Sequence, residues 1–510
     1  MSYRARYRWI AGVLILIVAA SAAACRGSGN PSATPTRPTP SMSSTPTTSS
    51  TRPNVVFILT DDLSWNLVQY MPQVERMETE GTTFTQYVVT DSLCCPSRSS
   101  IFTGNFPHDT GVFTNNAPDG GFGVFHARGE EAHTYASALQ HDGYVTGLMG
   151  KYLNGYQPTA TEGGSQPYVP PGWTQWDVAG NAYGEFNYDL NANHTVVHHG
   201  HAATDYLTDV LSGAGTAFIK SQAATHTPFA LEIATFAPHE PYTPAPADTK
   251  RFAHLVAPRT PAYDILPTAA PSWLKNEPPL AAVQQRNADV VFRERVQAVQ
   301  AVDRMIAKVR AALTAAGVAN DTYIVFSSDN GYHIGEYRLL PGKQTAFDTD
   351  VRVPLVVVGP GVPAGVTRDQ IVQNTDLAPT FEELAGVPVA PTVDGHSLVA
   401  LLRPGPVGDW RTAALIEHHG PNDAPDDPDA QPMRNGAPTT YEAMRTVTYT
   451  YVEYTDGEKE YYDRATEPNE LHNVVATLTT DRLTALHAAL VQLERCHGGA
   501  ACWAAGHTTL

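Results

Sequence analysis

The sequence predicts an α/β fold built around a large, mostly parallel sheet. Two continuous apolar runs, Asn54–Thr60 and Thr322–Ser328, are each followed by acidic or amide residues, and a third run, Pro354–Gly359, comes soon after. Runs without polar alternation are typical of strands buried on both faces. Residues 287–316 place valine and isoleucine at helical spacing, and strands that alternate with helices favour a parallel sheet.

The pattern changes beyond about residue 400, where short alternating segments predict an antiparallel sheet. We therefore expect a large domain over residues 54–400 and a small antiparallel subdomain over residues 401–510. The predicted strands are Ala413–Glu417, Arg445–Glu453 and Lys459–Tyr462, with a turn at Asp456-Gly457 between the last two. A helix is predicted near residues 479–495.

The N-terminus has the features of a targeting segment. Arginines precede the apolar run Trp9–Ala24, and small residues lead to Cys25. This order predicts a signal peptide over residues 1–25, too short for a confident membrane span, and its end resembles a bacterial lipobox. Residues 26–53 are almost wholly Ser, Thr, Pro, Gly and Asn, which predicts a disordered tether. The protein is expected to be exported, either as a lipoprotein anchored at Cys25 or as a secreted or periplasmic protein.

Charge excludes one class of partner. Residues 54–510 hold 27 basic and 51 acidic residues, a net charge of −24. A field of that sign repels polyanions, so nucleic acid is not an expected partner, and an anionic substrate must be held by local cations. Only four cysteines lie beyond Cys25, too few for a disulfide scaffold.

Oxygen ligands stand at the ends of two predicted strands. Asp61 and Asp62 follow the first run, and Asp329 and Asn330 follow the second. Either pair alone is typical of helix caps and Asx turns. Because parallel strands bring their carboxyl ends to one edge of the sheet, the two pairs together predict a metal site. Hard oxygen ligands of this kind suit Ca²⁺ and are poor ligands for zinc.

The most informative stretch begins at Leu93 and reads Leu-Cys-Cys-Pro-Ser-Arg-Ser-Ser-Ile-Phe-Thr-Gly. Taken alone, Cys94 and Cys95 could be a buried thiol pair or a vicinal disulfide. The stretch matches the sulfatase signature Cys-x-Pro-Ser-Arg with Thr-Gly after four more residues, and Cys95 occupies the variable position.

On these residues the chain resembles the formylglycine-dependent sulfatase family, in particular its N-acetylglucosamine-6-sulfatase branch. The resemblance covers roughly residues 52–502. It implies an alkaline-phosphatase-like α/β sandwich with a four-stranded C-terminal subdomain, and a tail closed by a Cys496–Cys502 pair, expected as a disulfide. The other shared stretches begin at Arg52 (Arg-Pro-Asn-Val-Val), Thr60 (Thr-Asp-Asp), Gly150 (Gly-Lys-Tyr-Leu-Asn), Tyr206 (Tyr-Leu-Thr-Asp-Val), Ala237 (Ala-Pro-His) and Ser328 (Ser-Asp-Asn-Gly-Tyr-His).

The resemblance also implies the chemistry. A maturation enzyme oxidises Cys94 to formylglycine, whose hydrate attacks the sulfur of a sulfate ester, and one Ca²⁺ ion held by the acidic pairs and the modified Cys94 offsets developing charge. Arg98 resembles the residue that steadies the hydrate. Lys151 and Lys343 resemble the lysines that clamp the sulfate, and His239 resembles the group that meets the leaving oxygen.

One family position is missing. Many arylsulfatases carry a histidine two residues after the clamp lysine, where this chain has Leu153, so Asn154 and His333 are the neighbours left as bases. His194, His198, His199 and His201 look like a metal cluster, but a surface loop is the favoured interpretation. Glu417 and His418 end a predicted strand and are candidates for the rim of the pocket.

The sequence thus predicts calcium-dependent hydrolysis of sulfate esters, with the 6-O-sulfate of terminal N-acetylglucosamine residues as the expected substrate. An aryl- or alkyl-sulfatase and a phosphonate monoester hydrolase are the alternatives within enzymes. A non-catalytic, surface-tethered glycan-binding lipoprotein is the alternative from another class, which an unmodified Cys94 would favour.

Overall fold

The computed structural model describes residues 52–421 and 427–510. The predicted signal peptide, the possible anchor at Cys25 and nearly all of the predicted tether lie outside the described residues. Within the described ranges, no helix has the length and the apolar character needed to cross a lipid bilayer. The predicted boundary near residue 400 stays a prediction.

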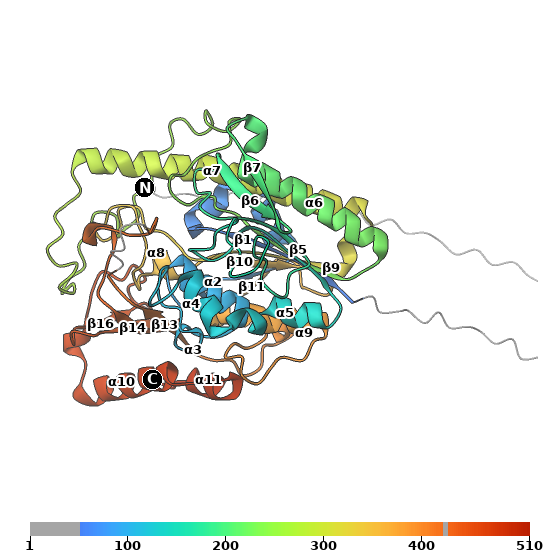
Figure 1. Ribbon diagram of the computed structural model, residues 1–510. Coiled ribbons are helices and arrows are strands. Elements are labelled where there is room, and N and C mark those ends of the chain that lie inside the picture. Colours follow the sequence, from blue (N-terminus) through green and yellow to red (C-terminus); the bar gives the residue numbers. More distant parts are fainter. Residues whose placement is uncertain (1–51, 422–426) are drawn as a thin grey trace, which may run out of the picture. The chain divides into compact units, whose positions relative to one another are not determined.

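A ten-stranded mixed sheet forms the centre of the fold (Figure 1). Its five central strands, in the order β9-β1-β8-β4-β5, run parallel to one another, whereas β10, β6 and β7 join it in antiparallel pairs. In order across the sheet, the strands are β11 (Val366–Arg368), β2 (Thr82–Phe84), β10 (Leu355–Val358), β9 (Thr322–Ser328), β1 (Asn54–Thr60), β8 (Phe229–Ala234), β4 (Val145–Lys151), β5 (Gln175–Ala179), β6 (Tyr188–Ala192) and β7 (Thr195–His199).

Helices cover both faces of this sheet, which gives three layers (Figure 1). The reason is visible in β1, where every residue is buried: Val55, Phe57 and Leu59 belong to one hydrophobic core, and Val56 and Ile58 belong to the other. The predicted alkaline-phosphatase-like α/β sandwich is therefore confirmed. One face is covered by α1 (Pro72–Glu80), α6 (Leu207–Thr225) and α7 (Ala282–Ala315), and the other by α2 (Cys94–Thr103), α4 (Gly121–Arg128), α5 (Tyr135–His141) and α9 (Leu377–Ala385).

Short elements complete the large sheet's surroundings. A two-stranded parallel ribbon pairs β3 with β12, and two helices of one turn each lie in the loops. Their bounds are Tyr87–Val88 for β3, Val372–Gln373 for β12, Pro107–Thr110 for α3 and Asp348–Val351 for α8.

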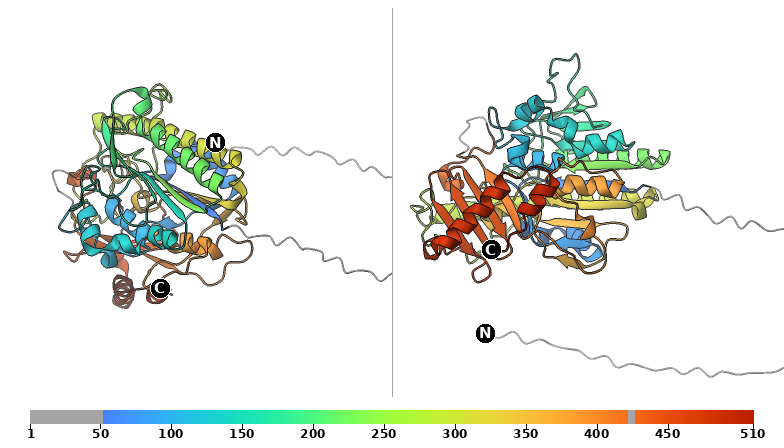
Figure 2. Two further views of the ribbon diagram at one scale, coloured as in Figure 1. Left: turned by 45° about the vertical axis from the view of Figure 1, so that its right-hand side comes forward. Right: turned by 90° about the horizontal axis from the view of Figure 1, so that it is seen from below.

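The predicted small antiparallel sheet is also present, with four strands in sequence order (Figure 2). A third hydrophobic core fills the space between these strands and α10, and includes Leu415, Tyr451 and Leu490. The elements are β13 (Ala413–His418), β14 (Tyr441–Thr446), β15 (Tyr449–Tyr454), β16 (Lys459–Asp463), α10 (Thr480–Glu494) and α11 (Gly499–Ala505). The disulfide expected between Cys496 and Cys502 joins the end of α10 to α11.

Buried charges help to hold the small sheet against the larger one. Arg445 of β14 is fully buried and pairs with Asp348 and Glu470, and Arg464 joins the same two carboxylates. A buried ion pair is costly to break because the surviving charge is left without a partner. This network therefore fixes the position of β14 relative to α8, which begins at Asp348.

Two sequence-based expectations differ from the structure. The run Arg445–Glu453 was predicted as one strand, but it is divided between β14 and β15 by a turn at Val447-Thr448. The long helix begins at Ala282, five residues earlier than predicted, because polar residues form its first exposed turn. Neither difference moves the carboxyl ends of β1 and β9.

Candidate active site

Four neighbouring parallel strands deliver polar residues to one edge of the large sheet. Asp61 and Asp62 follow β1, and Asp329 and Asn330 follow β9. Lys151 is the last residue of β4, and His239 lies five residues beyond the end of β8. Because these strands are adjacent in the order β9-β1-β8-β4, their carboxyl ends bring the side chains together, as the sequence predicted for the acidic pairs.

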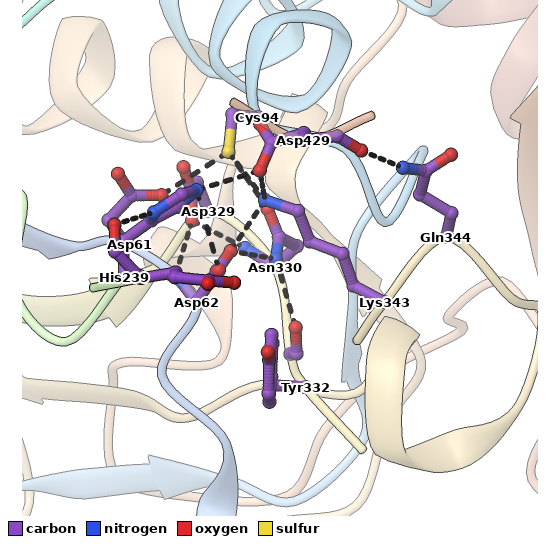
Figure 3. A network of polar contacts seen from close by, with 12 residues as sticks. Asp61, Asp62, Cys94, His239, Asp329, Asn330, Tyr332, Lys343, Gln344 and Asp429 are labelled. Carbon is purple, nitrogen blue, oxygen red and sulfur yellow. Dashed lines mark hydrogen bonds and ion pairs between the residues drawn. The ribbon is translucent and has the colours of Figure 1, made fainter. Parts of the chain in front are cut away.

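Cys94 is the first residue of α2, and its sulfur points into this group (Figure 3). Its Sγ is 2.9 Å from Lys343 Nζ, 3.2 Å from Asp61 Oδ1 and 3.6 Å from Asn330 Oδ1. Complete burial, followed by the nearby carboxylates of Asp429 and Asp61, raises the pKa of the Cys94 thiol well above its ordinary value. The unmodified residue is therefore a neutral thiol rather than a thiolate.

Cys95 has a different environment. Its side chain is fully buried in the hydrophobic core on the α2 side of the sheet, and its backbone N–H donates to Asn115 Oδ1 at 3.0 Å. Both cysteines are free, so the described structure contains no vicinal disulfide.

Three permanent cations pair with the carboxylates of the site. Lys151 Nζ donates to Asp61 Oδ2 at 2.5 Å, Lys343 Nζ donates to Asp62 Oδ1 at 2.7 Å, and Arg98 Nε donates to Asp329 Oδ2 at 2.8 Å. Burial alone would lower the pKa of each lysine, but the adjacent carboxylates raise both pKa values well above the ordinary range. All three side chains therefore remain charged.

His239 is the fourth cation. Its Nδ1 donates to the carbonyl oxygen of Glu240 at 2.7 Å, and its Nε2 lies 2.7 Å from Asp429 Oδ1. Burial opposes protonation, but the carboxylates of Asp62 and Asp429 raise the pKa of His239 to about 9. With an acceptor on each ring nitrogen, the side chain is an imidazolium that holds a proton on Nε2.

Asp429 is a member of the group that sequence analysis missed. It belongs to the small-sheet part of the chain, between β13 and β14, and only 2% of its surface is exposed. Its Oδ1 is 2.8 Å from Lys343 Nζ as well as 2.7 Å from His239, and its Oδ2 accepts from Asn115 Nδ2 at 2.7 Å. Lys343 and His239 hold the pKa of Asp429 well below its ordinary value, against the effect of burial.

A second missed residue, Tyr183, forms one wall. Its ring centroid is 4.4 Å from that of His239, and Lys151 Nζ lies 4.9 Å from the centre of the Tyr183 ring. The hydroxyl accepts from Asn154 Nδ2 at 3.3 Å. Tyr183 lies in a loop between β5 and β6 and has no motif around it, so no sequence signal distinguished it from the other tyrosines.

The donor set fits a hard divalent cation. Ligand atoms of Asp61, Asp62, Cys94 and His239 all lie within 4.8 Å of one another. His239 carries hydrogen on both ring nitrogens and has no lone pair to offer, which leaves carboxylate oxygens as the main donors. Oxygen donors of this kind suit Ca²⁺ better than zinc.

The two other predicted ligands border the same group. Asn330 Nδ2 donates to Asp62 Oδ1 at 2.7 Å, and its amide oxygen faces Cys94. Asp329 Oδ1 accepts the backbone N–H groups of Asp62 at 3.1 Å and of Asn330 at 2.8 Å. Asp62 itself has φ of 63°, a left-handed conformation that aspartate tolerates better than most residues and that this hydrogen bond helps to hold.

The remaining predicted residues lie elsewhere or in supporting positions. His333 is buried and its Nδ1 is 3.0 Å from both carboxylate oxygens of Asp350, and no contact joins it to Cys94. Glu417 and His418 end β13 as predicted, but both are buried and pair with His108 and Asp91 rather than with site cations.

The histidines of residues 194–201 belong to an exposed hairpin. The sequence favours a surface loop here, whereas His198 and His199 lie in the edge strand β7. Exposed His198 pairs with Asp189, and His199 lies 3.8 Å from Asp205. These histidines face individual carboxylates, and none of them is in a metal-sized cluster of the described residues.

Comparison with known proteins is consistent with this geometry. The family model described as Sulfatase matches residues 53–387, and that of N-sulphoglucosamine sulphohydrolase, C-terminal, matches residues 335–495. The N-acetylglucosamine-6-sulfatase of Homo sapiens is 33% identical over 474 residues, which cover 88% of this chain and 85% of that protein. The extracellular sulfatase SULF-1 homolog of Drosophila melanogaster is 37% identical over 381 residues, 72% of this chain, and the chain spans only 33% of that relative's length.

A solved structure shares the fold. A protein in complex with its substrate D-glucosamine-2-N,6-O-disulfate superimposes with a TM-score of 0.69 at 22% identity, covering 87% of this chain and 98% of that one. At this level of identity, the likeness concerns the arrangement of helices and strands.

The Asp429 contact gives a testable electrostatic prediction. In the Asp429→Asn variant, the pKa of His239 should fall by about one unit or more, because a buried carboxylate 2.7 Å from Nε2 is replaced by a neutral amide. NMR titration of the His239 ring nitrogens in metal-free protein measures this change. Glu240→Gln is the matched control, since Glu240 is exposed and only its backbone carbonyl contacts the ring. An unchanged His239 pKa in Asp429→Asn would contradict the assignment of Asp429 as the partner.

Proposed function

We propose that this chain, which belongs to the sulfatase family and is a sulfate-ester hydrolase, acts through a formylglycine made from Cys94 and with one bound Ca²⁺ ion. The observation that carries the proposal is the position of Cys94. Its Sγ lies at the first turn of α2, in contact with Lys343 and Asp61 and inside the group of four cations and four carboxylates. A maturation enzyme of the host is the partner that the modification requires.

The chain's own residues have separable roles in this proposal. When present, formylglycine supplies a nucleophilic hydroxyl and Ca²⁺ supplies a Lewis acid for a sulfate oxygen. Lys151 and Lys343 carry the positive charge that holds the other sulfate oxygens. His239 carries a proton on Nε2 that it can donate to the leaving oxygen once Asp429 is no longer its acceptor. Arg98 fixes the carboxylate of Asp329 through the contact at 2.8 Å.

The metal proposal also explains why the two lysines lie so close to carboxylates. Lys151 and Lys343 are the counter-charges of Asp61 and Asp62 in this structure. A divalent ion on those carboxylates supplies the same positive charge, which frees both ammonium groups to face an anion. The proposal thus assigns the lysines two successive partners, first protein carboxylates and then substrate.

The substrate we propose is a terminal N-acetylglucosamine residue, or a short oligosaccharide ending in one, with sulfate on O6. The relative from Homo sapiens carries that activity in its name. Deep burial supports action on a chain end, since Cys94 is fully buried and His239 and Lys151 are each 3% exposed. The net charge of −24 over residues 54–510 adds a long-range repulsion against highly sulfated polymers.

We also propose that the protein is exported and anchored through a lipid on Cys25. The disulfide between Cys496 and Cys502 supports an oxidising compartment, and the sequence of the targeting segment supports the anchor. The anchor is proposed as the only contact with a membrane.

The two cysteines provide the test of the nucleophile. Cys94→Ala should lower kcat/KM by more than about 1000-fold, because the aldehyde can form only there. Cys95→Ala should retain activity within about tenfold of the unaltered protein. The Cys95 side chain packs in the core, and the substitution removes only its small buried thiol. Kinetics on a sulfate ester, with mass spectrometry of the peptide that contains Cys94, measures both. Equal losses in the two variants, or an unmodified Cys94 in active protein, would overturn the assignment.

The metal ligands are tested by metal content rather than by activity alone. Asp61→Asn and Asp329→Ala should each lose bound calcium while the circular dichroism spectrum stays native, because each removes a carboxylate from the oxygen-rich group. Asp189→Asn, which changes only an exposed pair with His198, is the control and should keep its calcium. Zinc in place of calcium, or full activity after thorough removal of divalent metal, would show that the oxygen donors hold no catalytic calcium.

The substrate proposal predicts a salt-dependent preference. Catalytic efficiency on N-acetylglucosamine-6-sulfate should exceed that on a heparin-like chain, and added salt should narrow the gap. Screening over a Debye length of about 8 Å at physiological salt weakens the repulsion between the polymer and the acidic surface. Rates on both substrates at low and high salt test this, with an aryl sulfate and a phosphonate monoester for comparison. A preference for the polymer that is strongest at low salt would reveal a basic track, and a preference for the comparison substrates would favour the alternative activities.

A further inference from the structure

A large pocket lies away from the catalytic group. It has a volume of about 1030 Å³. Its lining residues come from α5, from α9, from the segment 388–393 and from His497-Gly498, which directly precede α11. Helices α5 and α9 lie side by side on the same face of the large sheet (Figure 1). Asn105, just beyond the end of α2, also lines it, whereas Cys94 begins that helix eleven residues earlier. The Asn105 end of the pocket is therefore about 16 Å from Cys94 along the helix axis.

One side chain in this pocket lacks a partner. Glu382 of α9 is 5% exposed, and its carboxyl group makes no hydrogen bond or ion pair with any residue in the described ranges. The side chain is largely buried, but its oxygens are not among the fully buried polar atoms that lack a partner, so they open onto the pocket. A largely buried charge without a partner is costly. Burial raises the pKa of Glu382 to about 7, with no neighbouring charge contributing. A buried carboxyl that faces an open pocket is an unfilled acceptor.

The charges of the lining select the sign of the occupant. Asp109, Glu130 and Glu382 line the pocket together with three histidines, and none of the lining residues is lysine or arginine. Asp109 is paired with His497, and Glu130 lies 3.5 Å from Arg128, so Glu382 is the carboxyl left to meet a ligand. This lining disfavours sulfate and other anions, in contrast to the catalytic site.

The size and the remaining surface select the type of ligand. A volume of about 1030 Å³ holds a monosaccharide easily. Alanine, proline and valine side chains offer apolar surface, and hydroxyl and amide groups lie beside them. The C–H groups of a sugar ring can pack on the apolar side chains, and its hydroxyls can bond the hydroxyl and amide groups. An ammonium group on the sugar can pair with the carboxylate of Glu382.

We propose that the pocket between α5 and α9 is a second ligand site, which binds a small polyhydroxylated amine of the amino-sugar type through the carboxylate of Glu382. The site is independent of the sulfatase chemistry, because none of its lining residues belongs to the catalytic group. Binding requires no covalent step.

Three sugars that differ at one position test the proposal. Glucosamine, glucose and N-acetylglucosamine are titrated into the full-length protein by calorimetry at pH 7.5. Glucosamine should bind at least about tenfold more tightly than the two neutral sugars, a ratio that corresponds to one favourable ion pair. Equal binding of glucose, or no binding of glucosamine up to about 10 mM, would overturn the proposal.

Two neighbouring glutamates supply the matched variants. Glu382→Gln should weaken glucosamine binding about tenfold or more, whereas Glu383→Gln should leave it unchanged, because Glu383 is exposed and does not line the pocket. Hydrogen exchange should show protection by glucosamine at Tyr135–His141 and Leu377–Ala385. Protection at the catalytic loops, or unchanged binding by Glu382→Gln, would place the ligand elsewhere.

A second readout tests the buried, unpaired carboxyl itself. The folded-state pKa of Glu382 is raised to about 7 from an ordinary value of 4.5, so the folded protein loses stability as pH rises from about 4.5 through 7. At pH 8 the Glu382→Gln variant should therefore have a Tm above that of the wild type, and Glu383→Gln should not. Glucosamine should raise the Tm of the wild type but not that of Glu382→Gln. A lower Tm for Glu382→Gln would mean that the carboxylate has a partner within the protein.

Discussion

The fold depends on the need to balance charges that are buried together. Four carboxylates, of Asp61, Asp62, Asp329 and Asp429, meet four cations, of Arg98, Lys151, Lys343 and His239, and every one of these residues is buried. An uncompensated ion in such a place is strongly destabilising, so each strand end must arrive within hydrogen-bonding distance of its partner. The register of the central strands and the docking of the small sheet both serve that requirement.

Strong local patterns explain which parts of this arrangement the sequence could predict. The runs at Asn54–Thr60 and Thr322–Ser328 are apolar throughout because both faces of these strands are covered, and the residues that follow them must lie at one sheet edge. The sulfatase signature located Cys94 and Arg98 by fixed spacing. The prediction of a single strand over Arg445–Glu453 is wrong, because a turn separates β14 from β15 there. The turn residues Val447 and Thr448 are themselves strand-favouring, so the sequence does not reveal the turn.

Asp429 could not be found in the same way. Residues 421–430 contain four aspartates among prolines and alanines, and nothing in that composition distinguishes the one that enters the site. Its role depends on tertiary contacts: Asn115 holds its Oδ2, and Gln344 Nε2 donates to its carbonyl oxygen at 2.7 Å. Sequence reasoning locates residues that follow regular elements or that match a family motif, as Lys343 does. It fails for a loop residue such as Asp429 that has neither signal.

The same balance constrains how the site can accept an anion. Four positive and four negative groups leave no surplus charge, and Asp429 already occupies the donors of His239 and Lys343. A sulfate ester must therefore compete with a protein carboxylate for those donors. Positive charge beyond that of the eight residues has to be supplied, and the oxygen-rich group around Asp61 and Asp62 fits a divalent ion that supplies it. On the proposed function, the Ca²⁺ ion and the substrate should therefore assist each other's binding, since each relieves the charge that the other leaves unpaired.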